Sequence, residues 1–187
     1  MLMADIPVIE TERLQITLYQ PEHAEALLSY YLDNRDFLAP WEPQRGEAFY
    51  SLEHFQTMAE LSVEGFEAAT TYRFIALERE SGELVACCNA NNVVWGAFRA
   101  CHLGFSIAER HQGCGLMEET LRPVLSYLET DVGLHRVMAN HLPHNERSAK
   151  LLAKLGFERE GYAKRYLKID GCWQDHVLTA LVFSDFD

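Results

Sequence analysis

The chain has 187 residues, 48% of them hydrophobic, which suits one domain with a sizeable core, and we expect residues 1–187 to form it. Its 16 basic and 28 acidic side chains give a net charge of −12, which opposes binding to nucleic acid and favours a basic partner, although many proteins are acidic for solubility alone. The five cysteines lack metal spacing, and there is no basic leader or long apolar run, so the sequence predicts a cytoplasmic protein without metal or membrane contact.

The first third of the chain predicts one strand and two helices. Residues 13–18 alternate between apolar and polar side chains, as a half-buried strand does. Pro21 suits the first turn of a helix, and Ser51 is a good cap for a second one. Between the two, the prolines of residues 37–43 predict an extended loop, because the residue before a proline avoids the helical region.

The middle of the chain predicts three strands. Residues 72–77 and 84–88 flank Ser81-Gly82, which is typical of a short hairpin connection. Residues 101–108 alternate again and lead directly into a turn rich in glycine.

That turn, residues 110–117, has the build of a phosphate site. Gly113 and Gly115 stand between a strand and a helix, where the lack of a Cβ lets successive backbone N–H groups point at one anion. No Gly-Lys-Ser/Thr ending of a Walker loop is present, and Glu118 stands where a dinucleotide fingerprint needs its third glycine. A plain helix entry remains the alternative. Pro123 predicts a kink or a break in the helix that follows.

The next segment predicts a strand and a helix. Residues 135–141 form the strand, which Pro143 ends. Asn145 caps the helix, and Gly156 closes it at a position that requires a left-handed residue.

The chain ends in a predicted hairpin. Asp170-Gly171 lies between two runs of strand-forming residues, 162–169 and 173–183, and is among the strongest short hairpin signals. The full order of elements predicts an α/β (α+β) domain with a mixed, mostly antiparallel sheet flanked by helices.

The turn, written Arg-x-x-Gly-x-Gly, resembles the acetyl-CoA motif of the Gcn5-related N-acetyltransferase (GNAT) superfamily, and the order of elements is similar to that of its fold. Further segments extend the likeness over essentially the whole chain. Within the family they resemble the enzymes that acetylate the N-terminal alanine of a ribosomal protein. These segments are residues 37–43, 138–140 with 143–145, 155–164, and 170–179.

The resemblance implies where acetyl-CoA lies. Two parallel strands, 103–108 and 136–141, would splay apart around it. Asn145 and Ser148 would contact the same ligand, although Asn145 is equally suited to a plain helix cap. The pantetheine arm would pair with the backbone of Phe105, Ser106 and Ile107, and the diphosphate would meet the amides of Gln112, Gly113, Cys114, Gly115 and Leu116.

The resemblance also implies candidate catalytic residues. A backbone N–H at a bulge near Phe105 would stabilise the oxyanion. The tyrosine acid of many relatives falls on Leu152 and is therefore absent, so Ser148 becomes the candidate proton donor unless it is an ordinary first-turn serine. The glutamate bases of other relatives fall on Asn140 and Leu167, so neither family base is present, and Asn140 stands as a catalytic candidate at the first of these positions.

The missing bases favour one kind of acceptor. An α-amine has an unperturbed pKa near 7.7–8, against about 10.4 for a lysine. Deprotonating the α-amine at neutral pH costs only about 1.4 kcal/mol, so an ordered water can accept the proton. The sequence therefore favours a protein N-terminus as the acceptor.

Three residues are candidates for the acceptor site. Glu42 can hold a cationic N-terminus, Trp41 can wall in a small first side chain, and Tyr166 lies in the predicted hairpin. Each also has a plain structural explanation: a loop anchor for Trp41, a solvated charge for Glu42 and a cross-strand packing pair for Tyr166.

The resulting hypothesis is a protein N-terminal acetyltransferase that transfers acetyl directly from acetyl-CoA to the N-terminal alanine of the fifth small-subunit ribosomal protein. Its partners would be that basic N-terminus and the small ribosomal subunit. Two alternatives stay open. One is an enzyme of the same fold that acetylates a small amine such as a polyamine or aminoglycoside, and the other is a ribosome-assembly factor whose role does not depend on acetylation.

Overall fold

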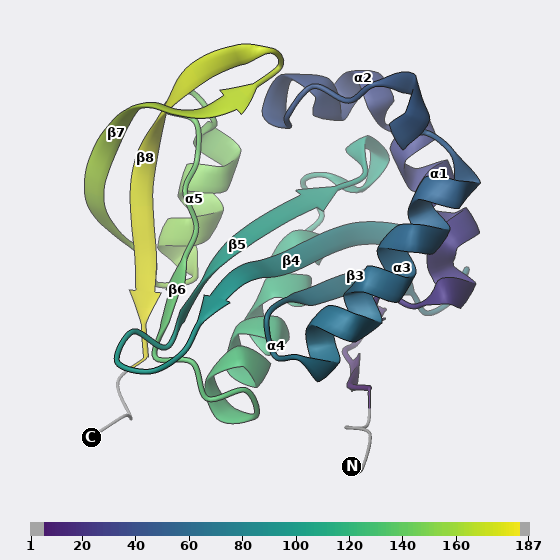
Figure 1. The fold of residues 1–187 in the computed structure, drawn as a ribbon, viewed down its shortest axis with the longest axis horizontal. Coiled ribbons are helices and arrows are strands. Elements are labelled where there is room, and N and C mark those ends of the chain that lie inside the picture. Colours follow the sequence, from purple (N-terminus) through teal and green to yellow (C-terminus); the bar gives the residue numbers. More distant parts are fainter. Residues whose placement is uncertain (1–5, 184–187) are drawn as a thin grey trace.

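The structure, a computed structural model, describes residues 6–183. These residues build one eight-stranded sheet with the order β1-β2-β3-β4-β5-β6-β8-β7 (Figure 1). Its strands are β1 (Val8–Glu10), β2 (Leu14–Leu18), β3 (Tyr72–Glu78), β4 (Leu84–Val94), β5 (Ala100–Ile107), β6 (Arg136–Met138), β7 (Glu158–Ile169) and β8 (Cys172–Val182). The α-helices are α1 (Ala24–Asp33), α2 (Arg35–Leu38), α3 (Leu52–Glu67), α4 (Leu116–Thr130) and α5 (Glu146–Lys154).

The pairing of the strands is mixed. Strands β5 and β6 run parallel, and the other neighbouring pairs run antiparallel. Because α4 carries the chain from the end of β5 back to the start of β6, the parallel pair has the helical crossover that such a pair needs. The predicted fold class, a mixed and mostly antiparallel sheet flanked by helices, is confirmed.

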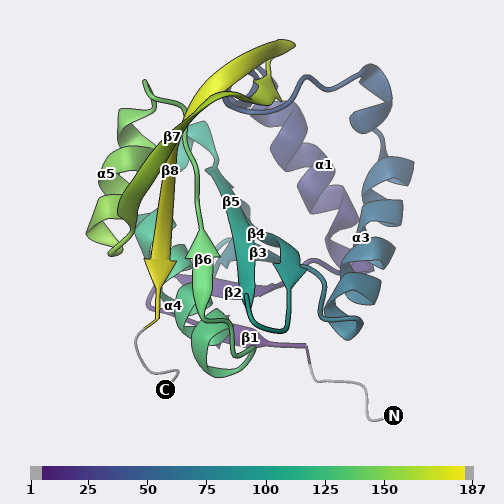
Figure 2. The same ribbon diagram turned by 60° about the vertical axis from the view of Figure 1, so that its left-hand side comes forward.

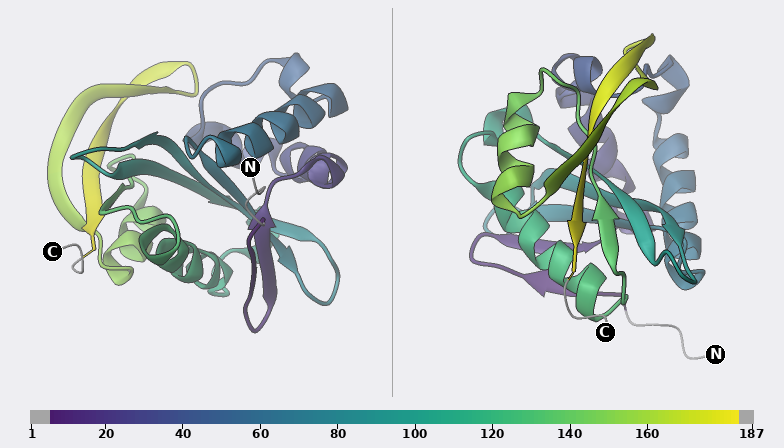
Figure 3. Two further views of the ribbon diagram at one scale, coloured as in Figure 1. Left: turned by 60° about the horizontal axis from the view of Figure 1, so that its bottom comes forward. Right: turned by 90° about the vertical axis from the view of Figure 1, so that its left-hand side faces the viewer.

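Helices cover both faces of the sheet. Helices α4 and α5 bury one apolar core against it, in which Leu121, Leu128 and Leu152 are almost fully buried. Helices α1 and α3 bury a second core on the opposite face, around Phe55 and Ile75. Figures 2 and 3 show the sheet between these two layers.

The predicted extended loop at 37–43 is wrong for its first half. Residues Arg35–Leu38 are α-helical, and Ala39–Trp41 form a 3-10 turn. Pro40 lies in the first turn of that short helix, where a missing backbone N–H breaks no hydrogen bond, and burial of Leu38 favours the compact form. Glu42, just before Pro43, has the expected extended conformation, with φ −118° and ψ 162°.

The elements on either side of the glycine turn also differ in part from the prediction. Helix α4 runs through Pro123 without the break that was one of the two expected outcomes, because the flanking Leu121 and Val124 are fully buried and their packing outweighs the lost hydrogen bond; the other, a kink, stays a prediction. Strand β6 ends at Met138, three residues earlier than predicted, and β1 was not predicted at all.

The predicted caps and turns are confirmed. The side chains of Ser51 and Asn145 accept hydrogen bonds from backbone N–H groups in the first turns of α3 and α5. Gly156 has φ +91°, and Asp170 and Gly171 both have positive φ, as a two-residue hairpin turn with the right twist requires. Among residues 6–183, we find no helix with the length and apolar character to cross a membrane.

Candidate active site

The candidate active site begins where β5 and β6 separate. Their pairing stops at His102 and Met138. Beyond Met138 the chain follows β8 instead: Ala139 donates its N–H to the Thr179 carbonyl at 3.0 Å, and His141 and Val177 exchange backbone hydrogen bonds at 3.1 and 2.9 Å. The two parallel strands are thus splayed, as expected from the family resemblance.

Asn140 fixes the separated segment through its side chain. Its Oδ1 accepts the Thr179 N–H at 3.2 Å, and its Nδ2 donates to the Tyr166 hydroxyl oxygen at 3.3 Å. Asn140 therefore ties the segment after β6 to both strands of the terminal hairpin, and these bonds account for both groups of its amide.

The separation exposes alternate backbone groups of β5. Ala108 donates its N–H to the Val85 carbonyl, and the register from Ala86↔Ile107 to Asn91↔His102 is regular. By antiparallel alternation, the backbone of Ser106 faces β4, and the backbones of Phe105 and Ile107 face the gap. Of the three residues expected to pair with pantetheine, two therefore offer free backbone groups to a ligand there.

The bulge expected near Phe105 is not found there. Phe105 lies opposite Cys88 in an unbroken register, whereas the register shift between β4 and β5 lies at residues 91–94 of β4, where Asn92 has φ +53°. The Phe105 N–H reaches the gap because β6 turns away from β5, so no bulge is needed.

A cavity of about 710 Å³ fills the gap and is lined from both layers of helices. Phe37, Leu38 and residues 41–43 line it from one face of the sheet, and the starts of α4 and α5 line it from the other. Two candidate residues, Cys114 and Tyr166, are not among its lining residues. The candidates that do line it are Trp41, Glu42, Phe105, Ser106, Ile107, Gln112, Gly113, Gly115, Leu116, Asn140, Asn145 and Ser148.

The glycine turn has the backbone conformation that its sequence predicts. Gly113 and Gly115 have φ +75° and +82°, in the left-handed region that L side chains rarely adopt. Gly115 is the N-cap of α4, so the unpaired N–H groups of that helix open at the cavity. Cys114 turns its thiol to the His111 carbonyl, and its own carbonyl accepts from Arg13. A nucleophilic role for Cys114 has no support in this arrangement.

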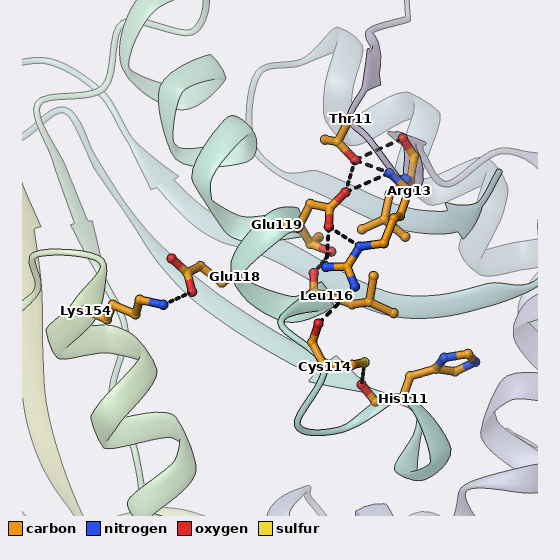
Figure 4. Close-up of polar contacts among 10 residues, drawn as sticks. Thr11, Arg13, His111, Cys114, Leu116, Glu118, Glu119 and Lys154 are labelled. Carbon is orange, nitrogen blue, oxygen red and sulfur yellow. Dashed lines mark hydrogen bonds and ion pairs between the residues drawn. The ribbon is translucent and has the colours of Figure 1, made fainter.

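A polar network from the start of β2 braces this turn (Figure 4). Arg13 donates to the Cys114 carbonyl at 3.0 Å and forms an ion pair with Glu119 at 2.6 Å, and the Thr11 hydroxyl donates to the same carboxylate at 2.6 Å. Burial disfavours the ionised carboxylate, but the hydrogen bonds from Thr11 and Arg13 outweigh it and hold the pKa of Glu119 below its ordinary value. Sequence reasoning missed this brace, because its ends lie about a hundred positions apart.

Sequence reasoning also missed two polar residues that line the cavity, Arg147 and His111. Arg147 of α5 lines the cavity and donates to the Gln112 side chain. It thus brings a guanidinium next to the glycine turn, where an anionic ligand would need one. His111 also lines the cavity and contacts Glu83 at 2.9 Å.

Another part of the cavity wall is formed by residues 41–43 and by the terminal hairpin, through Leu167, Ile169 and His176. The Asp170 N–H donates to the Glu42 carbonyl at 3.0 Å, which holds the hairpin tip against this loop. The Trp41 ring lies 5.6 Å from that of His144, just before α5. Burial raises the pKa of Glu42, opposed by Arg45 at 3.7 Å. The Glu42 carboxylate has therefore lost more hydration than Arg45 makes up for, and a cationic ligand would stabilise its charge.

Two histidines that looked scattered in the sequence, His141 and His176, also line the cavity. They come together because the segment after β6 pairs with β8. Within residues 6–183, no group of three or more histidine, cysteine or acidic side chains is placed to hold a metal ion.

The fold and the motif define the class. Residues 13–158 match the family described as the acetyltransferase (GNAT) domain. The chain therefore belongs to the GNAT acetyltransferase family, whose members use acetyl-CoA as the acyl donor, and the family and activity predicted from the sequence are confirmed.

Within this family, the chain is similar to acetyltransferases that modify ribosomal proteins. The chain is 44% identical to the ribosomal protein uS5-alanine N-acetyltransferase of Escherichia coli, over 95% of this chain and 92% of that protein. The crystal structure of the ribosomal-protein-S5-alanine acetyltransferase of Vibrio fischeri is similar with a TM-score of 0.93 and 34% identity, over 97% and 99% of the two chains. Mycobacterium smegmatis RimJ, solved in complex with CoA-disulfide, has a TM-score of 0.88 and 26% identity, over 99% and 90%.

The brace behind the glycine turn can be tested by E119Q. Loss of the Glu119 carboxylate should lower the free energy of unfolding by about 1 kcal/mol at pH 7, measured by urea denaturation. Because the folded-state pKa of Glu119 is depressed, its contribution exists above the ordinary glutamate pKa and disappears as the pH falls through the folded value. The difference from wild type should therefore be full at pH 7 and shrink as the pH falls below the ordinary glutamate pKa. E146Q is the control, since the Glu146 side chain is 79% exposed and should matter at no pH in this range.

Proposed function

We propose that the protein acetylates the N-terminal alanine of the small-subunit ribosomal protein uS5 in the cytoplasm, using acetyl-CoA. The observation that carries this proposal is a single cavity lined both by a glycine turn and by the desolvated carboxylate of Glu42. The likeness to two uS5-alanine acetyltransferases supports the choice of acceptor.

The donor end fits acetyl-CoA. The N-terminal amides of α4 and the left-handed glycines would hold the diphosphate through Gln112, Gly113, Gly115 and Leu116, with Arg147 supplying positive charge. The pantetheine arm would pair with the free backbone groups of Phe105 and Ile107. Asn145 already accepts the Ser148 N–H at 3.1 Å as a helix cap, so its contact with pantetheine would use its amide nitrogen.

The acceptor end fits a cationic N-terminus with a small side chain. Glu42 would receive the α-ammonium, because a buried carboxylate gains most from a charged partner. Trp41 would limit the space for the first side chain of the acceptor, and this limit favours a small residue such as alanine. Tyr166 does not line the cavity and would act there only through its hydrogen bond with Asn140.

The reaction needs no covalent enzyme intermediate. The neutral amine attacks the thioester carbon, the C–N bond forms, and the Phe105 N–H stabilises the oxygen as it becomes negative. The C–S bond then breaks, and the thiolate takes a proton from Ser148 or from a water held there. Asn140 is occupied by Thr179 and Tyr166, so its role is to position the segment after β6.

The acceptor can be tested by incubating the protein with acetyl-CoA and peptides. A peptide with the uS5 N-terminus should be acetylated on its α-amine, as detected by mass spectrometry. The same peptide with a blocked N-terminus and free lysines should not react. Turnover of polyamines or aminoglycosides without turnover of the peptide would refute the proposed acceptor. Full cellular function of a variant that no longer binds CoA would instead favour an assembly factor.

The donor site can be tested by G113A. Alanine at φ +75° is strained by about 1–2 kcal/mol, and relaxing it would turn the amides away from the diphosphate. We expect CoA affinity to fall about tenfold or more, measured by calorimetry. The matched control is G82A, which has a similar strain at φ +72° in the β3–β4 turn, outside this cavity. G82A should lower the free energy of unfolding by a similar amount and leave the affinity for CoA unchanged. An equal loss of affinity in both variants would contradict the diphosphate role.

The acceptor site can be tested by E42Q. Removing the charge should raise the KM for the peptide about tenfold while the affinity for CoA stays unchanged, since Glu42 follows the 3-10 turn at Ala39–Trp41 and belongs neither to the glycine turn nor to β5, which would hold CoA. E47Q is the control: Glu47 is a nearby glutamate, 81% exposed, that pairs with Arg35. A KM equal to that of wild type in E42Q would remove Glu42 from the acceptor site.

A further inference from the structure

We propose that His176, in the middle of β8, is the proton acceptor that converts the bound α-ammonium into the attacking amine. The role rests on the proposed acceptor, a protein N-terminus. It supplies the base that the sequence lacks at the two positions where related enzymes carry a glutamate, here Asn140 and Leu167.

The position of His176 is the first reason. It lines the same cavity as Phe105, Ser148 and Glu42, yet only 4% of the residue is exposed. The neighbouring Val177 exchanges backbone hydrogen bonds with His141, which fixes this part of β8 against the segment that leaves β5. His176 is thus held beside the gap in which the thioester and the amine would meet.

The hydrogen bond of its ring is the second reason. Nδ1 of His176 lies 3.1 Å from the Gln174 carbonyl oxygen. A carbonyl only accepts hydrogen bonds, so Nδ1 carries the hydrogen and Nε2 of the neutral ring holds a lone pair. No contact within residues 6–183 occupies Nε2 among the hydrogen bonds of the structure, so it is available as a base.

The surroundings keep the ring neutral at physiological pH. Burial lowers the pKa of His176, and the carbonyl of Gln174 opposes this. The His141 imidazole, from the segment after β6, lowers the pKa further, and Asp175 on β8 itself raises it. From β7, the Tyr166 ring lies 5.5 Å away. The net result is a pKa below the ordinary histidine value, so the base form is already present at pH 7.

The step balances without a further reactant. The α-ammonium gives one proton to Nε2 of His176, and the amine then attacks the thioester carbon. The nitrogen gives its second proton to Ser148 or to the water held there, which passes its own proton to the departing thiolate to give CoA-SH. The imidazolium finally returns the first proton to solvent.

His141 is the competing candidate. Its Nδ1 lies 2.9 Å from the Leu142 carbonyl oxygen, which fixes the same tautomer. His141 is, however, only partly buried, whereas His176 is enclosed by the hairpin and shielded from bulk water. The two residues therefore form a natural pair for comparison.

The test replaces each histidine by asparagine and follows kcat/KM for the uS5 peptide against pH. Asparagine can keep the hydrogen bond of Nδ1 to the carbonyl while it removes Nε2, so H176N and H141N are matched variants. Wild type and H141N should hold their kcat/KM from pH 8 down to about pH 6.5. H176N should match wild type above pH 8.5 and lose activity tenfold per pH unit below pH 8, where free amine becomes scarce. The expected deficit at pH 6.5 is about thirtyfold.

Three results would overturn the proposal. If kcat/KM of H176N followed the same pH dependence as wild type, water would be the proton acceptor. If H141N, and not H176N, lost activity at low pH, His141 would be the proton acceptor. An equal loss at every pH would show that His176 is structural. Failure of wild type to acetylate the peptide at all would count against the proposed function, not against the base.

A measurement on wild type covers the case in which H176N does not fold. The pKa of His176, followed by NMR titration of the labelled ring, should coincide with the acidic limb of the wild-type rate profile. A limb that follows the titration of another group would overturn the assignment.

Discussion

The separation of β6 from β5 is the constraint on which the rest of the site depends. Three pairs of residues hold the strands parallel, and then Ala139, Asn140 and His141 bind β8 instead. A continuous sheet would satisfy the backbone of Phe105 internally and leave no cavity. The loss of those few ladder bonds is offset by the Asn140 side chain and by the pairing of His141 with Val177. The chain thus gives up sheet continuity at one point and gains free hydrogen-bonding groups where a ligand can use them.

Two parts of the cavity wall are built in different ways. At the glycine turn the backbone itself supplies hydrogen-bond donors, and Arg13 and Glu119 brace that backbone. Around Glu42 side chains supply the polar groups, and the Asp170 N–H at the hairpin tip holds the Glu42 backbone in place. A fixed backbone suits a ligand common to a whole family, whereas side chains on loops suit an acceptor that differs among relatives.

Local signals were readable from the sequence, and long-range ones were not. Gly113 and Gly115 were predicted because glycine, which has no Cβ, adopts a positive φ without strain, and Asn145 because a helix start needs an oxygen acceptor. The fold class followed from the order of such elements. The Arg13–Glu119 brace and the meeting of His141 with His176 depend on tertiary pairing, which no local pattern encodes. The helical turns at 35–41 were missed because the buried Leu38 favours a compact form over the preference of the residue before Pro40.

The cavity is lined by residues of α2 from one layer of helices and by residues of α4 and α5 from the other. On the proposed function, both substrates would therefore share one hollow, with the acyl carrier beside the starts of α4 and α5 and the polypeptide beside Trp41. Because both would be bound at once, the acyl group would pass between them in one direct transfer, and a ternary complex would form before either product leaves.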